Sequence, residues 1–391
     1  MKVLIINPGS TSTKLAIYED GKPVWMSGAH HPVSELNKFH FAIEQYEYRM
    51  EFIRKRLADS DIKVEFDAVI ARGGLLKPLE GGVYLVNELM KHDLRNAHMD
   101  HACNLGALLA DELARECGCK AFIADPVVVD EMDEVARYTG MPEVRRKSVF
   151  HALNSKAVSR RYASTVGRSY EDLNLVVAHI GGGISVSAHR KGRVIDVNNA
   201  LDGEGPFSTE RAGTLPCGQL VDICFSGKYS KQQIMKMIHG RGGMIAYVGN
   251  NDMITISAEA ERGVEPYKTL LDAMIYTIAK QIGAMYVAMQ GKVDCIILTG
   301  GIAHSRYCMD LLKHRINYLA PITVIPGENE IESLAYNAFG ALRGELEVKE
   351  YGEEPTPDPS LGRGEVRSEE CGVRSEECGV RSEECGVRSV E

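Results

Sequence analysis

The sequence has no excess of basic residues and no long apolar run. Its 391 residues include 45 lysines and arginines against 54 aspartates and glutamates, a formal net charge of −9 with both signs interspersed. Such a chain offers no basic stripe for the phosphates of a polynucleotide, so a nucleic-acid partner is not expected. The apolar run at residues 3–6 is too short for a signal peptide, and no later stretch approaches a membrane span. We therefore expect a cytoplasmic protein without membrane contact.

Paired CxxC spacing is also absent. The cysteines of the first 350 residues are scattered between Cys103 and Cys308, a spacing that does not indicate a zinc site. Cys117 and Cys119 could form a ligand or redox pair. Cysteines of a cytosolic chain act more often as small buried hydrophobic residues, and this is the interpretation that we favour.

The chain does contain alternating strands and helices, which argue for α/β architecture. Two glycine-rich turns, at residues 8–13 and 181–183, each join two apolar strands. This internal echo predicts two related domains that face each other across a cleft. We expect the last amphipathic helix to return to the first domain. The predicted parts are a first domain of residues 1–150 plus 330–350, a second domain of residues 151–329, and a tail of residues 351–391.

The tail has a composition of its own. Three copies of Arg-Ser-Glu-Glu-Cys-Gly-Val begin at Arg367, Arg374 and Arg381. The seven-residue period would suit a coiled coil, but each repeat contains a glycine and little apolar surface to offset the entropy of ordering. We expect a disordered appendage with no catalytic role.

Three glycine turns at strand ends are the candidate nucleotide-binding elements: residues 7–14, 179–183 and 299–303. Glycine lets the backbone approach a ligand, and turn amides and hydroxyls can bind phosphate oxygens. The first turn lacks the GxxxxGK[ST] pattern and leads into a strand, so it does not support a P-loop protein. One such turn could simply reverse the chain, but a nucleotide clamped between two domains needs a turn from each.

Charged candidates stand at positions that suit phosphoryl transfer. Arg72 ends an apolar strand, and Arg211 lies in a loop rich in glycine and proline; either could stabilise transition-state charge or form a structural ion pair. Asp125 follows a strand and precedes a proline, as active-site carboxylates of open α/β sheets do. His101 and His151 stand near predicted helix starts, where a lone histidine is more often structural.

Together these segments resemble the acetate and butyrate kinase family of the actin, sugar kinase and Hsp70 superfamily. The likeness covers residues 1 to about 347, and three runs are similar to the butyrate kinase branch in particular: residues 7–14, 71–78 and 202–213. The resemblance implies two duplicated ribonuclease H-like (actin-like ATPase) domains around a nucleotide cleft. It also implies ATP and Mg²⁺ in the cleft, and direct transfer of the γ-phosphoryl group to a short-chain carboxylate.

The family's site residues carry over onto matching positions. The resemblance implies catalytic roles for Arg72, Asp125, His151 and Arg211. It implies substrate or phosphate binding by Asn7, Ser10, Ser12, Lys14, His101, His179, Gly181, Gly182 and Gly183. It implies adenosine binding by Gly300, Gly301 and Ile302. Asn7 and Glu330 would stand near the metal, although the register left Glu328 and Glu332 as alternatives.

Two departures from the acetate kinase pattern narrow the choice of acceptor acid. Gly182 replaces an asparagine typical of acetate kinases, and Arg72 is followed directly by Gly73-Gly74. Both departures favour butyrate or a branched short-chain acid over the alternative of an acetate or propionate kinase. Residues 126–129 could line the alkyl pocket or form strand core. A rival of another class is an ATP-driven binding protein related to actin or Hsp70. The family also implies a homodimer or higher homo-oligomer.

Overall fold

The computed structural model describes residues 1–97 and 100–352. These residues fall within one unit, Met1–Glu353, which contains two β-sheets. The predicted disordered tail lies outside the described residues except for its first two positions. Tyr351 is buried, and its hydroxyl donates a hydrogen bond of 2.8 Å to Asp93 Oδ2. The ordered chain therefore reaches at least this tyrosine.

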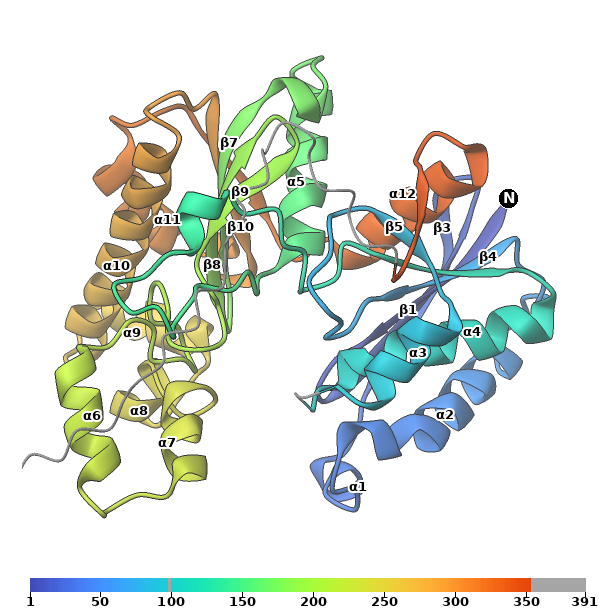
Figure 1. Cartoon of the computed structure of the whole chain (residues 1–391), viewed down its shortest axis with the longest axis horizontal. Coiled ribbons are helices and arrows are strands. Elements are labelled where there is room, and N and C mark those ends of the chain that lie inside the picture. Colours follow the sequence, from blue (N-terminus) through green and yellow to red (C-terminus); the bar gives the residue numbers. More distant parts are fainter. Residues whose placement is uncertain (98–99, 353–391) are drawn as a thin grey trace, which may run out of the picture. The chain divides into compact units, whose positions relative to one another are not determined.

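The strands of the first sheet are in the order β12-β5-β6-β4-β1-β2-β3, and those of the second are in the order β11-β10-β7-β8-β9 (Figure 1). The bounds in the first sheet are β1 Lys2–Pro8, β2 Ser12–Glu19, β3 Lys22–His30, β4 Ala68–Arg72, β5 Val83–Leu85, β6 Lys120–Ala124 and β12 Val348–Glu350. Those in the second are β7 Asn174–Ile180, β8 Ile184–Arg190, β9 Arg193–Val197, β10 Cys295–Gly300 and β11 Ile322–Pro326.

The two sheets repeat one topology. In the first, β1, β2 and β3 are antiparallel neighbours, whereas β1 pairs in parallel with β4, and β4 with β6. In the second, β7, β8 and β9 take the antiparallel part, and β7, β10 and β11 take the parallel part. This repetition confirms the prediction of two related α/β halves. It also brings the carboxyl ends of the parallel strands to one edge of each sheet, where sites of α/β proteins form.

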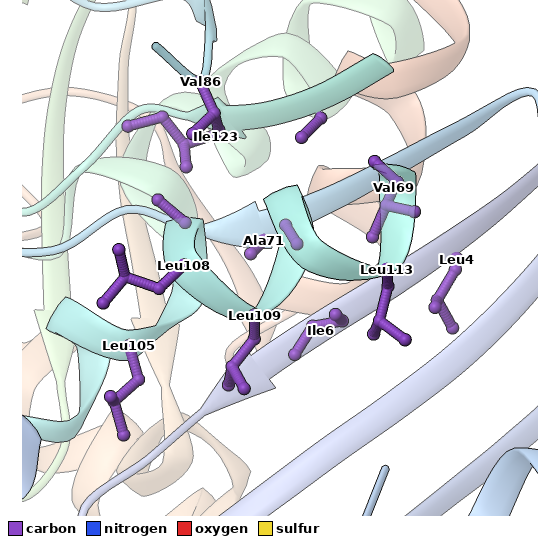
Figure 2. Packing of buried hydrophobic residues seen from close by; sticks show 14 of the residues in the cluster. Leu4, Ile6, Val69, Ala71, Val86, Leu105, Leu108, Leu109, Leu113 and Ile123 are labelled. Atoms are coloured by element: carbon purple, nitrogen blue, oxygen red, sulfur yellow. The ribbon is translucent and has the colours of Figure 1, made fainter. Parts of the chain in front are cut away.

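Helices cover both faces of the first sheet. On one face, α2 (Tyr46–Ala58) and α4 (Leu105–Cys117) pack against Leu4 and Ile6. Figure 2 shows the leucines of α4 over β1 and β4. On the other face, α12 (Glu330–Arg343) contributes Leu334 and Phe339, which pack with Val3 and Ile5. Because β1 is buried on both faces, it is a continuous apolar run rather than an alternating one.

The second sheet is covered in the same way. The helix α10 (Tyr267–Ala288) presents its predicted apolar stripe, including Leu271 and Ile278, to β7 and β8, with α11 (Arg306–Ile316) beside it. The opposite face receives α5 (Ala152–Thr165), which also contacts α12. The other helices are α1 Val33–Leu36, α3 Glu88–Arg95, α6 Cys217–Phe225, α7 Lys231–Ile238, α8 Met244–Val248 and α9 Met253–Glu261, and the short 3₁₀ helices are η1 Ala42–Gln45, η2 Ala102–Asn104, η3 Glu134–Arg137, η4 Tyr170–Asp172 and η5 Gly301–His304.

Residues 126–129, left open between alkyl pocket and strand core, form a turn. Val128 and Val129 are buried in two hydrophobic clusters. The strand interpretation is therefore wrong for this segment, and its two buried valines are core residues. Cys117 and Cys119 pack at the edge of the first core, as expected for small hydrophobic residues.

Candidate active site

The first glycine turn joins β1 to β2 and carries Ser10 and Ser12. Its tip is closed by a 2.8 Å hydrogen bond from Gly9 N–H to Ser12 O. Ser10 Oγ lies 3.1 Å from His101 Nε2, so these two predicted residues are brought together. Lys14 points to the exposed side of β2 and forms a 3.5 Å ion pair with Glu328, one of the alternative metal-site residues. The turn thus presents hydroxyl groups beside a histidine, with a lysine at its margin.

Asn7, Arg72 and Glu330 meet at the carboxyl ends of β1 and β4. Asn7 Nδ2 donates a 2.6 Å hydrogen bond to Glu330 Oε2, and Arg72 Nη1 lies 3.0 Å from Glu330 Oε1. Burial raises the pKa of Glu330, but Arg72 and Asn7 outweigh burial and lower that pKa below its usual value. Glu332, two residues farther along α12, is exposed and lies outside this contact. Of the three glutamates considered, the structure brings Glu330 to Asn7.

The cluster offers oxygen atoms that suit a divalent cation. Asn7 Oδ1 is buried and accepts no hydrogen bond from any described residue. It is an oxygen donor beside a glutamate carboxylate, and oxygen is the ligand that Mg²⁺ prefers. The described residues contain no group of three or more His, Cys, Asp or Glu side chains that could enclose a metal. Mg²⁺ usually keeps several waters and substrate phosphates among its ligands, so two protein oxygens fit such an ion.

The second glycine turn lies between β7 and β8 and is covered by Arg211. A Cβ on Gly183 would collide with the guanidinium of Arg211, so the glycine makes room for this approach. Ser208 Oγ donates to Gly182 O at 2.6 Å and accepts from Arg211 N–H at 3.1 Å, which ties the arginine loop to the turn. The guanidinium donates to Ala200 O and has no ion-pair partner among the described residues. Burial lowers the pKa of Arg211, as expected for a cation that lacks a counter-ion.

Two of the predicted histidines stack on each other at the same edge of the second sheet. The rings of His151 and His179 are 3.8 Å apart and nearly parallel, at 9°. His151 Nδ1 lies 2.9 Å from Ser185 Oγ, and His179 Nδ1 lies 2.8 Å from Asn154 Oδ1. These partners occupy Nδ1 of each ring. These hydrogen bonds therefore hold the two stacked imidazole rings in place.

The histidines of the site are held neutral. Burial, with the charges of nearby arginines, lowers the pKa of His101 to about 4 and the pKa of His151 well below its usual value. Burial also lowers the pKa of His179 to about 4, although Glu330 opposes the shift. Neutral imidazoles can donate a hydrogen bond to an anion without a change of charge at physiological pH.

We expect acid to destabilise the fold through these groups. The unfolded chain binds protons at histidines near pH 6.5, whereas the folded chain resists protonation down to about pH 4. The stabilisation is therefore complete above pH 6.5 and is lost as pH falls toward 4. Buried His31, with a pKa of about 4, and His189, with a pKa of about 3, add to it.

Thermal denaturation between pH 4.5 and 8 measures this effect. The midpoint should be nearly constant from pH 7 to 8 and fall steadily below 6.5. A His189→Gln variant should show a shallower acid slope than the wild type. A midpoint that is constant down to pH 5 would contradict the buried neutral histidines.

The third glycine turn follows β10. Gly300 has φ +91°, and a Cβ there would collide with Ile180 O, so only glycine fits this position. Gly301 faces open space, since nothing lies within 4 Å of the place where its Cβ would be. The side chain of Ile302 is buried in the core of the second sheet. Gly301 is therefore the open position of this turn, and Ile302 can offer only its backbone to a ligand.

The carboxylate of Asp125 forms its contacts with residues other than the candidates. Its Oδ1 accepts from Gly82 N–H at 2.8 Å, and its Oδ2 pairs with Arg160 of α5 at 3.0 Å. The side chain is buried, and neither partner is a predicted site residue. The structure thus places Asp125 in a link between the end of β6 and α5, not in the cluster around Glu330.

Sequence reasoning missed several residues that build this site. Asn154 and Ser185 hold the histidine stack, and Arg49 binds the back of the first turn. An arginine at position 49 lies in the apolar stripe of α2, between Tyr46 and Ile53, and this signal could have identified it. Two cavities, of about 370 and 530 Å³, lie along α12; Glu332, an alternative for the metal site, lines both, and none of the other candidates does.

Within the described residues, no helix is both long and apolar enough to cross a bilayer.

Several known proteins are similar to this chain. Residues 136–321 match the model of the acetokinase family. The chain is 64% identical over 351 residues to the probable butyrate kinase of Phocaeicola vulgatus, covering 90% of this chain and 99% of that protein. It is 49% identical over 352 residues to butyrate kinase 2 of Clostridium acetobutylicum, covering 90% and 99%. The crystal structure of Porphyromonas gingivalis acetate kinase is similar at a TM-score of 0.69, with 20% identity, and covers 86% of this chain and 99% of that one.

The solved structure confirms the actin-like ATPase fold that the resemblance implied, and the two relatives extend the likeness over nearly their whole length. The chain belongs to the acetokinase family.

Proposed function

We propose that this protein transfers the γ-phosphoryl group of ATP to butyrate, or to a branched short-chain acid, and so forms an acyl phosphate and ADP. Membership of the acetokinase family implies ATP and a carboxylate as substrates. The observation that carries the proposal is the partly buried guanidinium of Arg211, which covers Gly183 and has no ion-pair partner among the described residues. A partly buried cation without a counter-ion attracts an anion such as a carboxylate or a phosphate.

Catalysis in this site depends on positioning the two substrates and on neutralising their negative charge. A short fatty acid has a pKa of about 4 to 5, similar to a glutamate side chain, so the acceptor is already an anion and needs no general base. The obstacle is the approach of an anion to a polyphosphate. Arg72 and Arg211 bring positive charge to this region, and the guanidinium fork matches carboxylate and phosphoryl oxygens.

Asn7 and Glu330 would hold Mg²⁺ beside the phosphates. The buried Oδ1 of Asn7 and the carboxylate of Glu330 supply the two protein oxygens. When bound, the ion neutralises phosphate charge during transfer. Release of Glu330 from Arg72 would leave that guanidinium free for the acceptor carboxylate. The ion pair of 3.0 Å therefore competes with substrate binding.

The neutral histidines would donate hydrogen bonds to the transferring group. His101 reaches the first turn through Ser10, and His151 stands at the start of α5 near the second turn. Ser12, Lys14 and the glycines Gly181 and Gly182 would bind phosphate oxygens, and Gly300 to Ile302 would lie against the adenosine. The ion pair of Asp125 with Arg160 supports a positioning role for this aspartate rather than contact with the reacting atoms.

The same packing supports the proposed domains, residues 1–150 with 330–350 and residues 151–329. The apolar face of α12 packs against Val3 and Ile5 of the first sheet, although α12 follows the last strand of the second. The helix thus returns the chain to its first half.

An acceptor panel tests the proposed reaction. Purified protein is supplied with Mg-ATP and acetate, propionate, butyrate or isobutyrate, the acyl phosphate is trapped with hydroxylamine, and ADP is counted in parallel. We expect hydroxamate to form fastest with four-carbon acids. One methylene contributes about 1–3 kcal/mol of discrimination, so neighbouring acids should react more slowly rather than not at all.

Two outcomes would contradict the proposal. Preference for acetate would indicate an acetate kinase. ADP without hydroxamate, for every acid, would indicate an ATP-driven binding protein.

A further inference from the structure

Arg49 of α2 is a buried arginine that lies behind the first glycine turn. It has no exposed surface, although arginine is rarely buried unless it is paired. No carboxylate forms an ion pair with it among the described residues. Its acceptors are instead neutral groups of the turn and of its own helix.

All five N–H donors of the guanidinium are satisfied. Nη1 donates to Ser12 O at 2.9 Å and to Thr13 Oγ1 at 3.0 Å. Nη2 donates to Ser10 O at 3.2 Å, and Gln45 Oε1 accepts from Nη2 at 2.9 Å and from Nε at 3.0 Å. Three of the five bonds therefore end on the turn or on the first residues of β2. Only the planar fork of arginine can reach these acceptors together.

These bonds orient the peptide groups of the turn. In a trans peptide the C=O and the next N–H point in opposite directions. Because Ser10 C=O points at Arg49, the N–H of Thr11 points away from it. The N–H groups of Ser10 and Thr11 have no acceptor within the described part of the chain. Successive free N–H groups of a turn form an anion-binding concavity.

The charge of Arg49 reaches the site as well. Burial lowers the pKa of Arg49 to about 10, so the side chain stays protonated at neutral pH. Its charge contributes to the lowered pKa of His101, which lies 3.1 Å from Ser10 Oγ. A second polar contact secures the arrangement, since Thr13 Oγ1 also lies 2.8 Å from His31 Nε2.

We propose that Arg49 is a positioning residue for the phosphates of the nucleotide: by binding Ser10 O it turns the N–H of Thr11 toward the phosphate oxygens, beside the free N–H of Ser10, and it adds a buried positive charge behind them. This inference rests on the proposed function only for the presence of a nucleotide at this turn. It does not depend on the identity of the acceptor acid.

Binding of ATP and of adenosine, each measured by calorimetry on the full chain, separates positioning from general support of the fold. We expect Arg49→Met to weaken ATP binding by at least about tenfold, because the charged hydrogen bonds to the turn are lost. Adenosine binding should stay within about twofold of the wild type. Arg49→Lys keeps the charge without the fork and should bind ATP with intermediate affinity. Lys91→Met is the matched control. It removes a buried cation of α3 that is paired with Asp111 of α4, so it should lower the melting temperature but leave both affinities unchanged.

Several results would overturn the inference. A folded Arg49→Met variant that binds ATP as tightly as the wild type is one, and equal loss of ATP and adenosine binding is another. If Arg49→Met does not fold, Arg49→Lys and Thr13→Val decide by the same comparison, because Thr13→Val removes one acceptor of the fork. A wild type that binds ATP no better than adenosine would count against a phosphate site at the turn, and thus against the proposed function itself.

Discussion

Replacement of Arg211 by alanine should lower kcat/KM for the carboxylate by about 10³-fold, in line with arginines that stabilise phosphoryl transfer. The guanidinium covers Gly183 and has no ion-pair partner among the described residues, so its charge is available to the transition state. Most of the loss should appear in kcat, because the developing charge is greatest in the transition state. Hydroxamate formation at saturating Mg-ATP measures it.

Arg193→Ala is the matched control for Arg211. Arg193 lies on β9 of the same half and is exposed. Its removal should leave kcat/KM within about twofold, as surface substitutions usually do. If Arg211→Ala keeps its melting temperature and also keeps its activity, the arginine is structural and the assignment of the acceptor site is wrong.

Glu330→Gln should have two opposite effects. The neutral amide loses most of its attraction for Mg²⁺, so kcat/KM should fall by about 10²-fold and more Mg²⁺ should be needed for half-maximal rate. The same change removes the ion pair of 3.0 Å with Arg72. Butyrate should then bind more tightly than to the wild type when neither nucleotide nor metal is present. Calorimetry with butyrate alone measures this second effect without any turnover.

Glu332→Gln is the control on the same helix. Glu332 is exposed and lies outside the contact of Asn7 with Glu330, so neither the Mg²⁺ requirement nor butyrate binding should change. If Glu332→Gln raises the Mg²⁺ requirement and Glu330→Gln does not, the metal site has been assigned to the wrong glutamate. Weaker butyrate binding by Glu330→Gln in the absence of metal would show that Arg72 does not receive the acceptor.

Local sequence patterns were sufficient to predict the glycine turns and strand ends that frame this site. Glycine turns between apolar strands could be recognised because a close backbone approach needs glycine, and Gly183 and Gly300 have backbone or guanidinium groups where a Cβ would be. Arg72 was recognisable as a candidate because it ends an apolar strand, and the structure pairs that strand, β4, in parallel with β1. The repeated strand order could be predicted because both glycine turns join two apolar strands.

Long-range pairing could not be predicted in the same way. The carboxylate of Asp125 is bound by Arg160, 35 residues later, and nothing near Asp125 in the sequence indicates this partner. The choice of Glu330 depends on where α12 begins, and Asn329 before it adopts φ +47°, a conformation that a helical pattern does not reveal. Arg49 differs from these residues, because a charged residue within the apolar stripe of a helix is visible in the sequence itself.

In the proposed reaction, a carboxylate oxygen of the acceptor becomes the bridging oxygen between the acyl carbon and the phosphorus that ATP supplies. Phosphorus NMR of the protein with Mg-ATP and butyrate labelled with ¹⁸O in its carboxylate tests it in one measurement. The account predicts a new acyl-phosphate resonance that carries the isotope shift of a bridging ¹⁸O, together with an equal amount of ADP. ADP and inorganic phosphate without any acyl-phosphate resonance would contradict it.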